Sequence, residues 1–367
     1  MVALSALFQP VKLGGKQLNH RIVMAPMTRI RADDNHVPID LIREHYEQRT
    51  TEGGLLITEA TLISPNAGGG PHIPGLWTRE HIDGWRSVVD AVHKKKGVIY
   101  NQLWHKGRVS SSLLMPNNVK PVSASAIAIQ GKNSAGQDYE VPRALELDEI
   151  PQVIQEYATA AKNAVKAGFD GVEIHGASGY LVDQFITSSS NKRTDKYGGS
   201  IENRARFALE VIEAVVEAVG PEKTAIRFSP FGGFQDMNDD TPYETWGYIL
   251  DQLKNKHPNF SYVHFTEPRL NITNDTGFTD TDDSLDPFRA KWDGVFIASG
   301  GYTYDPKLAA EVAETTGNLI SFGRSFTSNP DLVERLRNGF PLEKYDRSTF
   351  YGGNSRGYAD FSNYIQQ

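Results

Sequence analysis

Three polar residues that could carry chemistry lie close together in the segment GVEIHGASGYLVDQF, residues 171–185. His175, Ser178 and Tyr180 fall within six positions, and only glycine and alanine separate them from one another. Imidazole, hydroxyl and phenol groups can exchange hydrogen bonds or protons with a small molecule, and such small neighbours leave them unshielded. Ser178 stands in GASGY, not in the G-x-S-x-G sequence of a hydrolase nucleophile, which argues against nucleophilic hydrolysis.

These residues follow a predicted strand. The run GVEIHG, residues 171–176, is short, apolar and contains β-branched residues, as expected for a strand that enters a core. If a helical turn begins where this strand ends, the i, i+3 spacing places His175 and Ser178 on one side. Tyr180 could instead be a core-facing helix residue whose hydroxyl is satisfied internally.

The same strand is one of eight apolar runs that alternate with amphipathic segments. The predicted strands are 21–27, 54–60, 97–104, 171–176, 224–230, 262–268, 294–300 and 319–324. The predicted helices are 41–49, 82–96, 150–168, 202–220, 245–255, 306–315 and 330–339, with a further turn or two at 288–292. This alternation predicts a parallel α/β fold, and eight repeats favour a closed (β/α)8 TIM barrel over an open doubly wound sheet. The absence of G-x-G-x-x-G after the first strand also counts against the open sheet.

Two intervals are too long for a plain barrel, residues 105–149 and 266–290. We expect both to lie over the carboxyl-terminal mouth, where barrels keep their active sites. Within the first, PVSASAIAI (121–129) and YEVPRALEL (139–147) could pair as a small hairpin. No linker divides the chain, so residues 1–367 are predicted to form a single barrel domain.

The composition excludes several classes of function. The net charge of −7 argues against a nucleic-acid surface or a basic membrane patch, and the absence of cysteine excludes thiolate metal sites and a cysteine nucleophile. The histidines show no metal-ligand spacing, so no metal is expected. The amino terminus lacks signal-peptide features, and no run nears the length of a membrane span. We therefore expect a cytoplasmic protein; the sequence leaves its oligomeric state open, a homodimer included.

Glycine-rich turns after the seventh and eighth strands form a second candidate site. Gly300 and Gly301 follow one strand, and Gly323 and Arg324 follow the next. Barrels commonly bind phosphate at these turns, because backbone N–H groups and a helix amino terminus suit an anion. Arg324 adds a bidentate donor. Glycine also occurs at ordinary strand–helix junctions, so simple turn chemistry is the alternative.

Eight motifs occur in the order in which they occur in one known family. They are HRIVMAPMTRIRA (20–32), LLITEATLISPNAGG (55–69), YNQLWHKGR (100–108), GFDGVEIHGASGYLVDQF (168–185), NKRTDKYGGSIENRARFALEV (191–211), IRFSP (226–230), FGRSFTSNPDL (322–332) and KYDRSTFYGG (344–353). Along essentially its whole length, the chain resembles the Old Yellow Enzyme family of FMN-dependent NAD(P)H ene-reductases.

The resemblance implies a non-covalent FMN at the barrel mouth. Its phosphate would bind to Arg324 and to the backbones of Gly300, Gly301 and Gly323. Arg227 would lie near N1 and the C2 carbonyl, where a fixed cation favours the anionic reduced flavin. The remaining implied contacts are Thr28 and the Ala60 main chain near the C4 carbonyl, Gln102 at the pyrimidine edge, Pro26 and Met27 below the ring, and Trp104, Phe350 and Tyr351 around the pocket. Arg227 could alternatively pair with Glu173 across the barrel interior.

The implied reaction is the reduction of an activated C=C bond in an unsaturated carbonyl or nitro compound, with NADPH or NADH as reductant. His175 and Ser178 would hold the substrate oxygen, and Tyr180 would donate a proton to the α-carbon. The family normally has Asn or His where this chain has Ser178, which puts the substrate in doubt. A specialised-metabolite reductase or isomerase, a flavin-free barrel lyase or isomerase acting on a phosphorylated substrate, and a redox-inactive binding protein are the alternatives.

Overall fold

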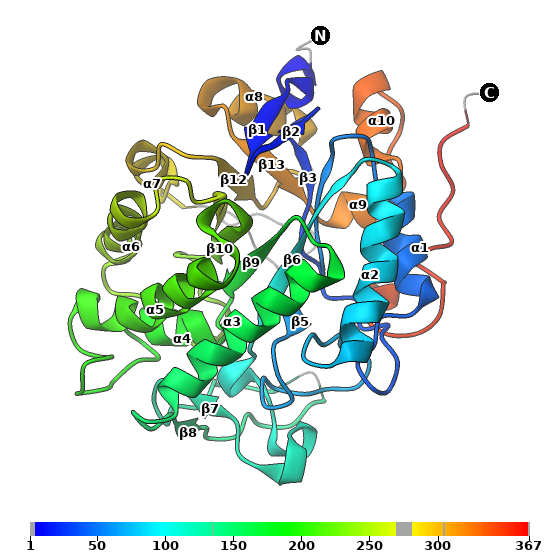
Figure 1. The fold of residues 1–367 in the computed structure, drawn as a ribbon. Helices are drawn as coiled ribbons and strands as arrows, with labels where there is room; N and C mark the ends of the chain where they lie inside the picture. The colour runs from blue at the N-terminus through cyan, green and yellow to red at the C-terminus, as the bar shows by residue number, and fades with distance from the viewer. Residues whose placement is uncertain (1–3, 134, 269–280, 304, 366–367) are drawn as a thin grey trace.

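The computed structural model describes residues 4–133, 135–268, 281–303 and 305–365 (Figure 1). Part of the second long interval, residues 269–280, therefore lies outside the described residues. Across the described ranges, no helix combines the length and the apolar character needed to cross a bilayer.

Eight parallel strands close into a barrel. They are β3 (Ile22–Met24), β4 (Leu55–Ile57), β6 (Val98–Trp104), β9 (Gly171–Gly176), β10 (Thr224–Phe228), β11 (Tyr262–Thr266), β12 (Phe296–Ser299) and β13 (Leu319–Phe322). Each strand pairs in parallel with the next one, and β13 pairs with β3 to complete the ring. The short strand β5 (Thr61–Leu62) adds to the edge of β6. The predicted TIM barrel is confirmed, and each of the eight barrel strands lies inside its predicted run.

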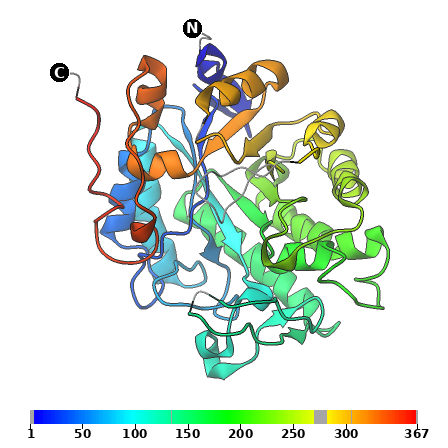
Figure 2. The same cartoon turned by 180° about the vertical axis from the view of Figure 1, so that it is seen from behind.

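Helices cover the outside of the barrel (Figures 1 and 2). The long ones are α1 (Asp40–Gln48), α2 (Arg79–Lys94), α3 (Ile150–Ala167), α5 (Ile201–Val219), α6 (Pro242–Lys256), α8 (Pro306–Thr316) and α10 (Leu332–Asn338). The short ones are α4 (Leu181–Ile186), α7 (Asp286–Lys291) and α9 (Arg324–Ser328), with 3₁₀ turns at Leu4–Phe8, Gly107–Val109, Ser112–Leu114, Pro116–Asn118, Pro221–Lys223, Phe234–Asp236 and Arg347–Thr349. Capping side chains define helix starts; Thr78 accepts from the His81 N–H at α2, and Ser200 accepts from the Asn203 N–H at α5.

The barrel interior changes from apolar to polar along the strands. An apolar cluster fills its amino-terminal end with one or two side chains from most strands, and Leu13 and Leu18 of the hairpin β1 (Val11–Leu13) and β2 (Lys16–Leu18) join it. Two residues further along the strands, the same alternation brings polar residues to the inner face. Tyr100, Ala225, Tyr262, Ile297 and Leu319 are thus succeeded by Gln102, Arg227, His264, Ser299 and Ser321.

The long interval after β6 does not form the predicted hairpin. Its strands β7 (Val122–Ser123) and β8 (Arg143–Ala144) are parallel, so the hairpin prediction is wrong. The chain between them must turn back before it pairs, and the only antiparallel contact described there is a single bridge between Lys132 and Asp138. The interval does lie over the mouth, because Arg108 donates to the carbonyl of Gln235 at 2.8 Å in the loop after β10.

Candidate active site at the barrel mouth

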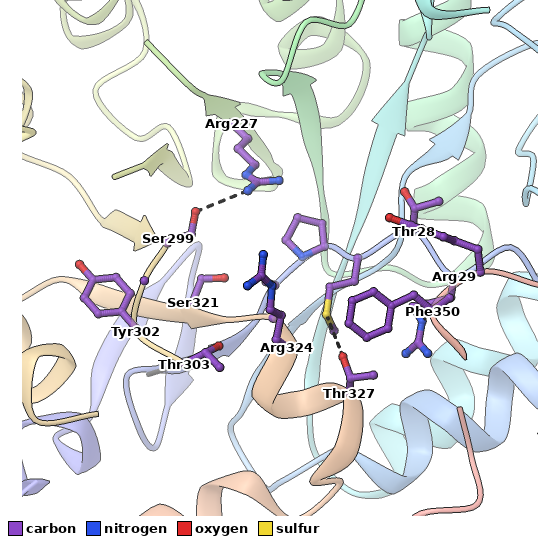
Figure 3. A pocket seen from close by; sticks show the side chains of 17 residues that line it. Thr28, Arg29, Arg227, Ser299, Tyr302, Thr303, Ser321, Arg324, Thr327 and Phe350 are labelled. Atoms are coloured by element: carbon purple, nitrogen blue, oxygen red, sulfur yellow. Dashed lines mark hydrogen bonds between the residues drawn. The ribbon is translucent and has the colours of Figure 1, made fainter. Parts of the chain in front are cut away.

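A cavity that is partly open to solvent lies at the carboxyl-terminal ends of the strands (Figure 3). Residues 25–29 after β3, Arg227 on β10, the turns after β12 and β13, and Phe350 and Tyr351 near the carboxyl terminus line it. Eight of the ten residues predicted to bind a cofactor are in this lining: Pro26, Met27, Thr28, Arg227, Gly300, Gly301, Gly323 and Arg324. Ala60 and Gln102 are buried nearby but do not line it.

Two arginine side chains point into the cavity from opposite sides (Figure 3). Arg227 donates only weakly, to Thr266 Oγ1 at 3.4 Å and Ser299 Oγ at 3.5 Å, and its Nε has no partner among the described residues. Burial lowers the pKa of Arg227, but a guanidinium stays protonated in proteins. Arg324 enters at the start of α9. A partly buried cation such as Arg227, with weak internal partners, favours an anionic or acceptor-rich ligand.

The turns that complete the cavity are made of bare backbone. Gly300 and Gly301 have φ values of 116° and 78°, which residues with a side chain rarely adopt. A Cβ at Gly323 would make only ordinary van der Waals contact, 3.4 Å from the sulfur of Met27. Ser321, on the inner face of β13, has a buried hydroxyl with no partner in the described chain. The backbone can therefore approach a phosphate closely.

A buried polar network lies beside Arg227 inside the barrel. Glu173 accepts from the Gln102 amide at 2.7 Å and pairs with Nδ1 of His264 at 2.9 Å. Burial alone would raise the pKa of Glu173, but His264, with help from Arg227 and Gln102, holds that pKa below its ordinary value. In the structure Glu173 contacts His264 and Gln102 directly, so Arg227 acts on this carboxylate through space.

Three aromatic rings form a second group next to the cavity. The ring centres of Trp104 and Tyr180 lie 4.8 Å apart, those of His175 and Tyr180 also 4.8 Å, and those of Trp104 and His175 6.4 Å. His175 is the register partner of Arg227 on the adjacent strand, which joins this group to the cavity. Among the residues predicted to hold or surround the substrate, Phe350 and Tyr351 line the cavity itself.

The protonation states in this group follow from burial. Burial, reinforced by Arg227 and His264, lowers the pKa of His175 well below its ordinary value, so its ring is neutral. Its Nδ1 has no hydrogen-bond partner among the described residues. Burial likewise raises the pKa of Tyr180, so its phenol keeps its proton at neutral pH.

Ser178 is not in a helical turn, contrary to the sequence-based expectation. Its φ of 57° is left-handed, and α4 begins only at Leu181, with Tyr180 as the preceding cap residue. The Ser178 N–H donates to Ser229 Oγ at 2.7 Å, which ties the turn to the end of β10. The short link between β9 and α4 forces this reversal, so helical i, i+3 spacing does not relate Ser178 to His175.

The sequence did not reveal a set of hydrogen bonds that holds the segment of Phe350 and Tyr351 against the loop after β3. Arg29 donates to the carbonyls of Phe350 at 2.9 Å and Gly357 at 2.8 Å, and Arg31 donates to Thr349 at 3.0 Å. Glu59 accepts from the N–H groups of Arg29 at 3.1 Å and Ile30 at 3.0 Å, which fixes the loop after β3. In the sequence, Arg29, Arg31 and Glu59 appear only as parts of the motifs MTRIRA and TEA. Those motifs do not show which groups the three side chains contact.

Comparison with known proteins gives matches over almost the whole chain. Residues 6–343 match the model of the NADH:flavin oxidoreductase / NADH oxidase family. A protein named "Putative 12-oxophytodienoate reductase 5", from Oryza sativa subsp. japonica, is 50% identical over 348 residues, which cover 94% of this chain and 91% of that protein.

Solved structures are also similar to this chain over almost its whole length. Morphinone reductase in complex with tetrahydroNAD has a TM-score of 0.89 and 41% identity, and the match covers 98% of each chain. An old yellow enzyme homologue from Zymomonas mobilis has a TM-score of 0.89 and 38% identity, with 97% of this chain and 99% of that chain covered.

Proposed function

Because the chain belongs to the Old Yellow Enzyme family of flavin-dependent oxidoreductases, we propose that its cavity holds FMN and that the adjoining group of His175, Ser178 and Tyr180 receives the alkene. The enzyme is an NAD(P)H-dependent oxidoreductase that reduces activated C=C bonds. When bound, FMN accepts reducing equivalents from the nicotinamide and passes them to the alkene. The side chains of the protein bind and orient the cofactor and the alkene, and one of them supplies the proton.

The observation that carries this assignment is the partly buried Arg227, which faces the cavity without a strong internal partner. The lining fits FMN, since two arginine side chains and bare glycine turns would suit an acceptor-rich ring and a phosphate. We assign the phosphate to Arg324 and the backbones of Gly300, Gly301 and Gly323. The ring is assigned to Arg227, Gln102, Thr28, Ala60, Pro26 and Met27.

On the substrate side, we assign His175 and Ser178 to the carbonyl or nitro oxygen. A neutral imidazole has one N–H to donate, and donors fixed in a dry site stabilise negative charge as it develops on that oxygen. Tyr180 is the proton donor to the α-carbon; burial keeps its phenol protonated, and its ring lies beside both His175 and Trp104. Trp104, Phe350 and Tyr351 shape the pocket.

The names of the relatives support an unsaturated carbonyl substrate, since they are reductases of an oxo acid and of morphinone. The family membership sets aside a flavin-free lyase, whereas reduction or isomerisation of a specialised metabolite remains compatible with it. The preference for NADPH over NADH, the cytoplasmic location, a homodimer and the absence of nucleic-acid partners stay predictions, and so does the single domain of residues 1–367.

The visible spectrum of the purified protein tests the assignment. We expect a flavin band, FMN in the supernatant after denaturation, anaerobic bleaching by NADPH or NADH, and recovery of the band when an enone is added. A colourless protein that binds no added FMN would refute the flavin site. A flavoprotein that is reduced but not reoxidised by any enone or nitroalkene would refute the alkene site.

A further inference from the structure

A buried lysine beside the alkene group has no role in the function proposed above. Lys106 lies two residues after β6 and is only 9% exposed. Its ammonium makes one hydrogen bond, to the carbonyl of Gly69, and this bond is long at 3.3 Å. Charge-assisted bonds are normally about 2.7–2.9 Å, and lysine is seldom buried without a counter-charge. No carboxylate pairs with Lys106 in the part of the chain that the structure describes.

The wall facing this side chain is a glycine loop. Gly68, Gly69 and Gly70 all have positive φ values, of 127°, 53° and 118°. A Cβ at Gly68 would lie 2.5 Å from the Cβ of Lys106, so only glycine there leaves room for the lysine stem. A Cβ at Gly70 would lie 3.8 Å from the ammonium nitrogen. The loop therefore accommodates the lysine and places no side chain of its own over the charge.

The ammonium also lies beside the ring group at the alkene site. Lys106 Nζ lies over Trp104, 5.9 Å from its ring centre, and Trp104 packs edge-on against Tyr180 at 4.8 Å. The indole N–H of Trp104 is buried and has no acceptor among the described residues. Two donors with too few acceptors thus occur two residues apart, at the end of β6 and just after it. A ligand with two acceptor oxygens and a negative charge would satisfy both.

We propose that Lys106, together with the indole of Trp104, binds a carboxylate on the alkene substrate, so that the preferred acceptor is an unsaturated carbonyl compound with an acidic side chain. This inference rests on the proposed function, since it places the reacting carbons at His175 and Tyr180. Burial lowers the pKa of Lys106 to about 8, which still leaves the side chain mostly protonated at neutral pH. The carboxylate supplies the counter-charge that the protein itself does not.

Matched acceptors test the proposal: a cyclic enone with a carboxymethyl side chain, and its methyl ester. Wild-type enzyme should have a higher kcat/KM for the acid than for the ester. In Lys106→Gln the acid-to-ester ratio should fall about tenfold or more, mainly through KM of the acid, as expected for the loss of a charge-assisted hydrogen bond. Exposed Lys132→Gln, whose ammonium pairs with Asp138 on the surface, is the control and should keep the wild-type ratio.

A binding measurement accompanies the kinetics. Calorimetric Kd values for 4-hydroxyphenylacetate and its methyl ester should differ in the wild type, and Lys106→Gln should remove most of that difference. The inference is overturned if wild type treats acid and ester alike, or if Lys106→Gln weakens both equally. If Lys106→Gln does not fold, the wild-type comparison still decides. Failure of the proposed function would instead show as no turnover of the neutral ester by wild type.

Discussion

Arg227 and Glu173 carry opposite charges inside the barrel on adjacent strands, without a direct ion pair between them in the described chain. Arg227 faces the cavity, whereas Glu173 is held by Gln102 and His264. Arg227 therefore makes the electrostatic potential at the proposed flavin site positive, and the negative charge of Glu173 lowers that potential. We infer that Glu173 limits how strongly the site favours an anionic ligand.

Glu173→Gln should therefore favour reduced over oxidised FMN. The neutral amide keeps the shape of the side chain but removes the negative charge. We expect the reduced cofactor to gain about tenfold in relative affinity, which raises the two-electron potential by about 30 mV. Equilibration with a reference dye measures this potential. Glu52→Gln, at an exposed surface pair with Lys96, is the matched control; an unchanged or lowered potential in Glu173→Gln would contradict the inference.

For single residues, the sequence indicated which ones belong to the site better than it indicated their conformation. Thr28 and Arg227 were predicted from the family resemblance, and Arg324 was predicted from its place in a turn after a barrel strand, where barrels commonly bind phosphate. The left-handed turn at Ser178 could not be predicted, because its φ of 57° is set by the link to α4 and by the bond to Ser229, not by a local signal. Lys106 was not singled out, because burial is a property of the folded chain.

Among the elements, the carboxyl-terminal segment that follows α10 is held by arginine side chains as well as by apolar packing of Tyr358 and Ala359. Arg31 donates to the carbonyls of Thr349, Phe350 and Asn354 at 3.0, 3.2 and 3.1 Å, and its guanidinium lies 4.3 Å from the ring centre of Tyr358. Phe350 and Tyr351, which line the cavity, belong to this segment. The contacts link the loop after β3 to one wall of the site.

Arg31→Ala should loosen this wall. Removing the guanidinium leaves several carbonyls without a donor, and each lost bond to a charged group contributes about 1.5–3 kcal/mol. We expect faster limited proteolysis between residues 345 and 358 and a KM for the enone that is several-fold higher, with the barrel intact. Arg79→Ala, at an exposed pair with Asp83, serves as the control. An unchanged cleavage pattern together with an unchanged KM would show that the segment is held by other contacts.

The regular elements could be predicted from the sequence because strands of the barrel are continuous apolar runs and helices have an apolar period. The pairing of β7 with β8 could not. Each has two residues, and their register depends on backbone bonds such as the one from Arg143 N–H to the Pro121 carbonyl at 2.8 Å. Such short pairings leave no periodic pattern in the sequence.

For the molecule as a whole, one end of the barrel provides stability and the other provides the site. The apolar cluster and the β1–β2 hairpin occupy the amino-terminal end, and the polar inner residues, the glycine turns and the loop after β6 gather at the carboxyl-terminal end. Family membership and fold follow from the entire chain. Within this site, we propose that flavin and alkene use adjoining but different sets of residues.

Rapid kinetics on Tyr180→Phe test this claim most directly. The flavin residues are untouched by the change, so anaerobic reduction of the cofactor by NADPH or NADH should keep nearly the wild-type rate. Reoxidation by an enone should slow by about 10²–10⁴-fold, because the change removes the proposed general acid. Equal slowing of both half-reactions, or of neither, would contradict the account.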